Sequence, residues 1–190
     1  MIDRFIDSGA IVAGWVGLGV GLVVAIAFEL IIPVQTVVFL LAPVVGVVIG
    51  VYANVRAERH RPLGRVLANA AWAGLVTGIG LAVFYVAIRL VFVYADTGSL
   101  PDGTSLHCQT GPACIYLRYV DAGQTDELAA SGITDGASLE AAVWRELMAT
   151  GTGMVLLTIG GALVGGAGRA VSAPRRPVVA ARPNLHTPRP

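Results

Sequence analysis

The sequence has few charged residues and no lysine. Charged residues make up 13% of its 190 residues, whereas soluble domains carry about 25%. All thirteen basic residues are arginine, which favours a bacterial genome rich in G and C. Hydrophobic residues make up 55% and are gathered in long blocks. This composition excludes an ordinary soluble domain and predicts an all-α membrane protein.

Ionisable side chains are missing from the middle of these apolar blocks. No His, Asp or Glu lies there, which argues against a proton relay and against a haem ligated by histidine inside a bundle. The sequence also contains no motif for catalysis and no aromatic pattern for nucleic-acid binding. We therefore expect no cofactor, no metal, no catalytic residue and no nucleic-acid partner.

Four apolar blocks are long enough to cross a membrane, which takes about 20 residues. They run from about residue 10 to 32, from 37 to 55, from 66 to 94 and from 147 to 168. The predicted organisation is three transmembrane helices in residues 1–94 with a basic loop at 56–65, an extracytoplasmic loop at 95–146, a fourth transmembrane helix at 147–168, and a disordered tail rich in Pro and Arg at 169–190.

Arginine is distributed unevenly among the segments that join the blocks. The N-terminus, the 56–65 loop and the tail hold ten Arg and three acidic residues, whereas the 95–146 loop holds two Arg and eight acidic residues. Short Arg-rich loops stay in the cytoplasm. We therefore expect a plasma-membrane protein with both termini in the cytoplasm. The Arg residues of the tail are expected to contact anionic lipid headgroups or to act only as a topology anchor.

The pattern W-x-G-L-x-x-G-x-x-x-A occurs at Trp15 and again at Trp72, in two helices predicted to run in the same direction. A tandem duplication of a helical hairpin and a chance match are both open. Small residues also recur every four positions, which lets helices approach closely within a bundle or in a homo-oligomer. The glycines that we expect at such contacts are Gly17, Gly21, Gly46, Gly50, Gly74, Gly78, Gly161 and Gly165.

Glu29 and Arg89 are the two charged residues inside the predicted spans. Both lie near the outer ends of their helices and have opposite signs. An intramembrane ion pair is the favoured interpretation. Independent contact of each side chain with interfacial water, and a substrate or ion site, are the alternatives.

Cys108 and Cys114 lie in the extracytoplasmic loop, where disulfides form and persist. Residues 110–113 indicate a turn and residues 114–120 are rich in strand formers, so we predict a short hairpin closed by a disulfide. A metal site that includes His107 is a weaker alternative, because a fourth ligand is missing. Later in the loop, Ser138 is the predicted N-cap of a helix that continues into the fourth span.

The favoured function is a non-enzymatic structural, accessory or regulatory membrane subunit whose outer loop contacts a membrane-complex partner. A small oligomeric transporter or channel is the first alternative. The second is a thiol-redox membrane protein that uses Cys108 and Cys114. Four-helix bacterial thiol oxidases carry a Cys pair in each of two outer loops, and this chain has one pair.

Overall fold

The computed structural model describes residues 6–27, 35–56, 62–100, 104–108 and 110–172. Within these residues the chain forms six helices: α1 (Ser8–Ile26), α2 (Gln35–Arg56), α3 (Leu63–Tyr94), α4 (Pro112–Asp121), α5 (Thr125–Ala130) and α6 (Gly136–Ser172). The described residues contain no β-strand. A single antiparallel bridge joins Ser99 to Ser105.

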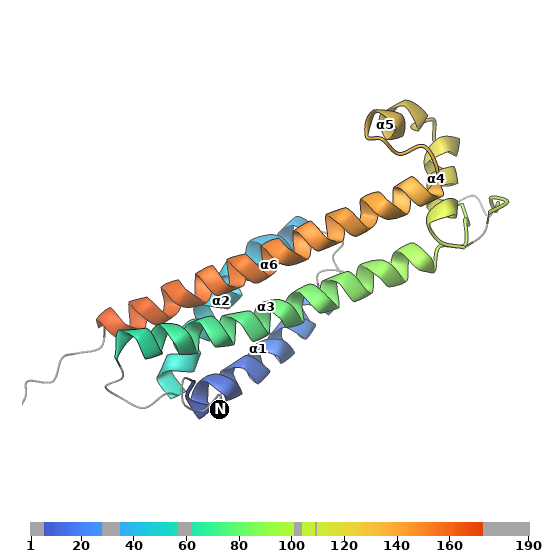
Figure 1. Ribbon diagram of the computed structural model, residues 1–190. Coiled ribbons are helices and arrows are strands. Elements are labelled where there is room, and N and C mark those ends of the chain that lie inside the picture. The colour runs from blue at the N-terminus through green and yellow to red at the C-terminus, as the bar shows by residue number, and fades with distance from the viewer. Residues whose placement is uncertain (1–5, 28–34, 57–61, 101–103, 109, 173–190) are drawn as a thin grey trace, which may run out of the picture.

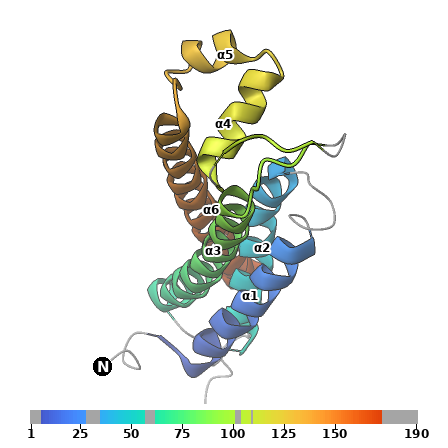
Figure 2. The same ribbon diagram turned by 90° about the vertical axis from the view of Figure 1, so that its right-hand side faces the viewer.

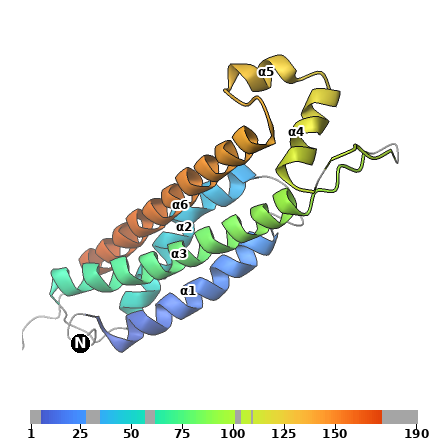
Figure 3. The same ribbon diagram turned by 45° about the vertical axis from the view of Figure 1, so that its right-hand side comes forward.

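Four helices, α1, α2, α3 and α6, form an elongated bundle (Figure 1). The start of α1 and the end of α6 lie at one end of this bundle, and α4 and α5 lie at the other end (Figures 1 and 2). α3 lies between α1 and α6 and contacts both, while α2 contacts all three of the others (Figure 3). We call α4 and α5, with the segment that joins α3 to α4, the cap of the bundle.

Three of the described helices, α1, α3 and α6, are long and apolar enough to cross a membrane. This confirms the prediction of an all-helical protein with membrane-spanning character. α2 adds a shorter apolar stretch, Phe39–Val55. At 1.5 Å per residue, the 32 residues of α3 and the 37 residues of α6 extend about 48 Å and about 55 Å. Both exceed the hydrocarbon thickness of about 30 Å, so both helices are long enough to continue into water.

α2 and α6 run in the same direction with their backbones in contact. Pro43 of α2 faces Gly161 of α6, and Val47 faces Gly165 four residues later. A β-carbon at either glycine would overlap the carbonyl oxygen of the facing α2 residue. The two helices therefore approach each other at a distance that only glycine permits here.

The α2 side of this contact has the same construction. Gly46 and Gly50 lie against the backbone of Thr158 and Ala162 in α6. A β-carbon at either position would again overlap a carbonyl oxygen of the other helix. The α2–α6 contact is thus reciprocal, with two glycines from each helix facing the backbone of its neighbour.

α1 and α3 also run in the same direction, but their contact is built differently. Gly17 faces Thr77, and a β-carbon at Gly17 would overlap the Thr77 hydroxyl. Gly21 faces Leu81, and a β-carbon at Gly21 would lie 3.3 Å from the Leu81 backbone nitrogen. Here the α1 glycines admit side chains of α3 as well as its backbone.

The matching glycines of α3 face another helix. A β-carbon at Gly74 would lie 2.6 Å from the Ala162 side chain, and one at Gly78 would lie 3.0 Å from the Val155 Cα, both in α6. The order of these contacts shows that α3 and α6 are antiparallel. The two copies of the tryptophan pattern therefore place their glycines against different neighbours.

The predicted hairpin is wrong, because residues 112–121 form helix α4. Pro112 occupies the first turn, where a missing N–H costs no hydrogen bond, and one side of the helix packs against α6. This tertiary contact outweighs the strand preference of the aromatic and β-branched residues. A strand-like pairing occurs instead between Ser99 and Ser105, in a segment whose Gly, Pro, Asp and Ser residues favour irregular structure.

Candidate functional site

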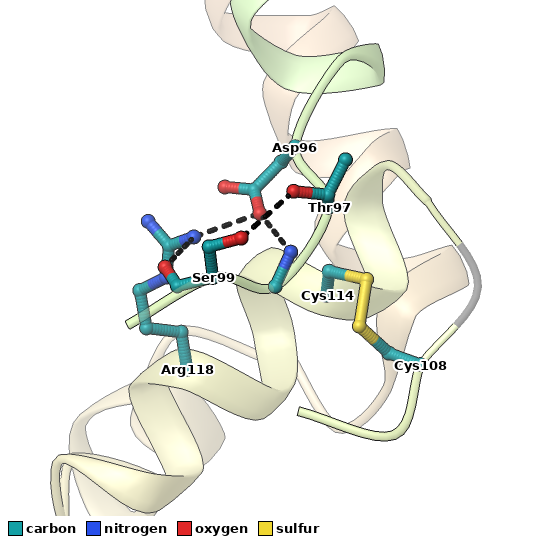
Figure 4. The surroundings of a disulfide bond; sticks show 7 residues. Asp96, Thr97, Ser99, Cys108, Cys114 and Arg118 are labelled. Atoms are coloured by element: carbon teal, nitrogen blue, oxygen red, sulfur yellow. Dashed lines mark hydrogen bonds and ion pairs between the residues drawn. A yellow bond between two sulfur atoms is a disulfide. The ribbon is translucent and has the colours of Figure 1, made fainter. Parts of the chain in front are cut away.

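The chain leaves α3 through a turn built around Asp96. Its carboxylate accepts hydrogen bonds from the backbone N–H of Gly98 and from the guanidinium group of Arg118 in α4, both at 2.8 Å. Arg118 also donates to the Ser99 carbonyl at 3.3 Å (Figure 4). The Asp96 side chain is 12% exposed and the Arg118 side chain 43%, so solvent is excluded mainly from the carboxylate side of this ion pair. One cation thus holds the turn after α3 against α4.

A disulfide joins the same turn to α4. Cys108 and Cys114 are bonded with their Cα atoms 5.3 Å apart, and Cys114 lies fully buried in the first turn of α4 (Figure 4). Gly98 packs over the sulfur atoms with a φ of +72°, and a β-carbon there would lie 2.6 Å from the Cys108 sulfur. Glycine is required at this position by both the backbone angle and the space.

The start of α4 is tied back to the end of α3. The backbone N–H of Gly111 donates to the Asp96 carbonyl at 2.8 Å, and Gly111 has a φ of +96°. The backbone N–H of Cys114 then donates to the Gly111 carbonyl at 2.9 Å. The start of α4 is therefore held to the segment after α3 by backbone hydrogen bonds, by the disulfide and by the ion pair.

α4 is also anchored on the first turn of α6. A β-carbon at Gly136 would lie 2.9 Å from the Cα of Ala113, so the two backbones touch. Leu139 of α6 is buried at 6% exposure close to this contact. By contrast, none of the six residues of α5 is buried. The cap therefore has a fixed base formed by α4 and a second helix, α5, in which no residue is buried.

The first turn of α6 is closed by a reciprocal hydrogen-bond pair. The Asp135 carboxylate accepts the backbone N–H of Ser138 at 2.7 Å, and the Ser138 hydroxyl oxygen accepts the backbone N–H of Asp135 at 3.0 Å. Asp135 is thus the capping residue, and the prediction that Ser138 is the N-cap was wrong by one turn. The bonds from Ser138 hold the pKa of Asp135 below its ordinary value of 3.8.

Three side chains meet between the end of α3 and the first turns of α6. The Tyr94 hydroxyl donates to the Glu140 carboxylate, and the indole N–H of Trp144 donates to the Tyr94 oxygen at 3.3 Å. No pattern in the sequence predicts that Tyr94 and Trp144 touch. Only the antiparallel alignment of α3 with α6 brings residues fifty positions apart into contact.

The opposite end of the bundle carries a buried polar cluster. Asp7 is 8% exposed; its carboxylate accepts hydrogen bonds from the Asn69 amide at 2.9 Å and from Arg65 at 3.1 Å. The Asn69 oxygen accepts the backbone N–H of Asp7 at 3.0 Å in return. This cluster fastens the start of α1 to α3. Asp7 lies about sixty positions from Arg65 and Asn69, and no pattern in the sequence connects them.

The predicted pair of intramembrane charges falls partly outside the described residues. Arg89 lies on α3 and is half-buried, whereas Glu29 is not among the residues that the structure describes. The ion-pair hypothesis therefore stays a prediction.

Metal-ligating side chains are not gathered anywhere in the part of the chain that the structure describes. The described residues contain no group of three or more His, Cys, Asp or Glu side chains placed to hold a metal ion. His107 is exposed, while its neighbour Cys108 is engaged in the disulfide. No protein family, curated protein sequence or solved structure matches this chain. The geometry itself is thus the basis for a functional proposal.

Proposed function

We propose that this protein is a non-enzymatic, four-helix integral protein of a bacterial plasma membrane that serves as a structural, accessory or regulatory subunit. In this proposal both termini are cytoplasmic and the cap faces outward, where it contacts a partner protein. The observation that carries the proposal is the construction of the cap. Its base is fixed by a disulfide and a part-buried ion pair, while no residue of α5 is buried.

The arrangement of the helix ends supports this topology. The start of α1 and the end of α6 lie at the same end of the bundle, as an even number of crossings requires (Figure 1). The Arg-rich segments flank this end in the sequence, and the acidic loop forms the cap at the other end. Oxidising conditions outside the cytoplasm also suit the Cys108–Cys114 disulfide.

The interior of the bundle favours a structural role over transport. Thr77 and Thr158 are fully buried, and each hydroxyl donates to a backbone carbonyl of its own helix, at 2.8 Å and 2.7 Å. Such hydroxyls need no substrate as a partner. A transport path needs polar groups that converge at membrane depth. The buried cluster of Asp7 and Asn69 lies instead at one end of the bundle.

Site-specific photo-crosslinking in intact membranes tests the proposal. A photoreactive residue replaces Tyr119, which is 43% exposed on α4, and the matched control replaces Val164, which is 67% exposed on α6. We expect position 119 to capture one defined protein that also co-purifies with the unlabelled chain in mild detergent. Cys108→Ser should weaken that capture, because without the disulfide α4 is no longer bonded to the segment that follows α3. Recovery of the chain alone from position 119, with no co-purifying protein, would contradict the accessory role.

A further inference from the structure

An apolar groove of about 440 Å³ lies on the surface between α3 and α6, in the part of the bundle nearer to α4. This volume is within the range of small-ligand clefts, about 300–1,000 Å³. Val83 and Met148 line its rim and are each more than half exposed. Ala82 and Gly151 form its floor, where a β-carbon at Gly151 would lie 3.6 Å from the Ala82 side chain. The groove exists because small residues meet where the two helices touch.

Polar side chains lie just beyond the end of the groove that is nearest to α4. Tyr94 follows the groove residue Leu90 by one helical turn, and Trp144 precedes the groove residue Met148 by one turn. Residues four apart share a helix face, so Tyr94 and Trp144 lie above the groove. Their hydrogen bond at 3.3 Å bridges the two helices there, and the Glu140 carboxylate accepts from the Tyr94 hydroxyl.

We propose that the groove binds one acyl chain of a zwitterionic phospholipid, with the ammonium group of the lipid at Tyr94, Trp144 and Glu140. This inference rests on the proposed function, because it requires α3 and α6 to cross a membrane. An empty groove facing hydrocarbon would lose dispersion contacts along its whole lining. A lipid chain restores these contacts.

Charge complementarity selects the headgroup. An ammonium group is attracted to the Glu140 carboxylate and to the faces of Tyr94 and Trp144. Arg145 is exposed at the next position of α6 and supplies a cation for the lipid phosphate. Phosphatidylglycerol also offers a phosphate to Arg145, but it has no ammonium group to pair with Glu140. The groove should therefore prefer phosphatidylethanolamine to phosphatidylglycerol.

Lipid titration followed by native mass spectrometry tests the inference on the delipidated full chain. The probes are phosphatidylethanolamine and phosphatidylglycerol with identical acyl chains. Val83→Phe fills the groove from its exposed rim, and Val91→Phe adds the same bulk on α3 outside the groove, at a position that is 64% exposed. We expect Val83→Phe to bind phosphatidylethanolamine about tenfold more weakly, a change of about 1.4 kcal/mol, and Val91→Phe to bind like the unaltered protein. Equal binding by both variants would overturn the proposal.

The headgroup is tested separately with Glu140→Gln, which keeps a hydrogen-bond acceptor and removes the charge. We expect this variant to keep binding a phospholipid and to lose its preference for phosphatidylethanolamine. A preference for phosphatidylglycerol in the unaltered protein would overturn the assignment. Dimerisation that Val83→Phe abolishes would also overturn it, because a second copy would then fill the groove.

A fluorescence readout keeps the inference testable if Val83→Phe does not fold. With Trp15→Phe and Trp72→Phe, Trp144 is the one remaining indole. Lipids brominated on the acyl chain near the headgroup should quench it more strongly in phosphatidylethanolamine vesicles than in phosphatidylglycerol vesicles. Equal quenching would count against a bound lipid. Extraction of the chain from membranes by alkaline carbonate would instead contradict the proposed membrane function, so the two failures are distinguishable.

Discussion

The α2–α6 and α1–α3 contacts are both parallel helix pairs lined with glycine, yet they are built differently. In α2–α6, four glycines face backbone carbonyl groups, two from each side. In α1–α3, the glycines of α1 admit Thr77 and Leu81, and a polar cluster at Asp7 fastens one end. The first pair depends on backbone against backbone, whereas the second combines a side-chain contact at Gly17, a looser backbone contact at Gly21 and one polar anchor.

This difference shows that the spacing of glycines predicts where two helices approach closely. It does not predict how well that helix contact tolerates a substitution. A backbone carbonyl cannot move without shifting its whole helix, whereas a side chain can adopt another rotamer. A buried polar cluster responds to substitution in another way, because removing one partner leaves the other buried without its hydrogen bond. The two contacts should therefore respond differently to equivalent substitutions.

The largest effect is expected in the α2–α6 contact. Gly161→Ala places a β-carbon on the Pro43 carbonyl oxygen and should lower the free energy of unfolding by about 3 kcal/mol. The neighbouring Gly160 has open space around it, so Gly160→Ala should be neutral or raise stability by up to about 1 kcal/mol. Unfolding in mixed micelles measures both. Equal effects of the two substitutions would refute the backbone contact.

The next effect is expected at the polar anchor of α1–α3. Asp7→Ala removes the acceptor for Asn69, which is fully buried, and for Arg65, and should cost about 2 kcal/mol. Asp7→Asn retains an oxygen acceptor and should cost less. The same micelle unfolding assay gives both values. If Asp7→Ala is no more harmful than Asp7→Asn, the cluster does not fasten α1.

A smaller effect is expected within the α1–α3 contact itself. Gly17→Ala should cost about 1 kcal/mol because it displaces the Thr77 side chain. Thr77→Ala combined with Gly17→Ala should recover part of this loss. Gly19→Ala is the control, since no atom lies within 4 Å of a β-carbon there. Strictly additive effects at Gly17 and Thr77 would show that the two residues do not meet.

The smallest effect concerns the first turn of α6 alone. The pKa of Asp135 is below 3.8 in the folded protein, because Ser138 donates to its carboxylate. The stabilisation is fully present above pH 3.8 and is lost as the pH falls through the lower pKa of the folded state. The protection factor of the Ser138 amide against hydrogen exchange should therefore fall only in that acidic range. Asp135→Asn should abolish this pH dependence, and an unchanged profile would contradict the capping role.

The sequence was sufficient to predict the helical class because long apolar blocks leave few alternatives. It also located the two cysteines that form the disulfide. The helix α4 was missed because Ile115, Tyr116 and Val120 favour strands locally, and only packing on α6 makes them helical. The contacts of Asp7 with Asn69, and of Tyr94 with Trp144, depend on how distant helices align.

The glycine positions show the same limit. Gly17 and Gly74 occupy equivalent places in a repeated pattern, yet one faces α3 and the other faces α6. A repeat in sequence states which residues are small, and it does not state which neighbour each small residue meets. Whether the pattern arose by duplication stays a prediction.

The most direct test of the account is the sidedness of the two bundle ends in intact cells. Ser131→Cys places a thiol on the exposed cap beside α5, and Leu63→Cys places one at the start of α3, at the other end and 57% exposed. The native cysteines are bonded to each other and do not compete for a maleimide. A membrane-impermeant maleimide should label position 131 in intact cells and position 63 only after permeabilisation. Labelling of both positions, or of position 63 alone, in intact cells would contradict the account.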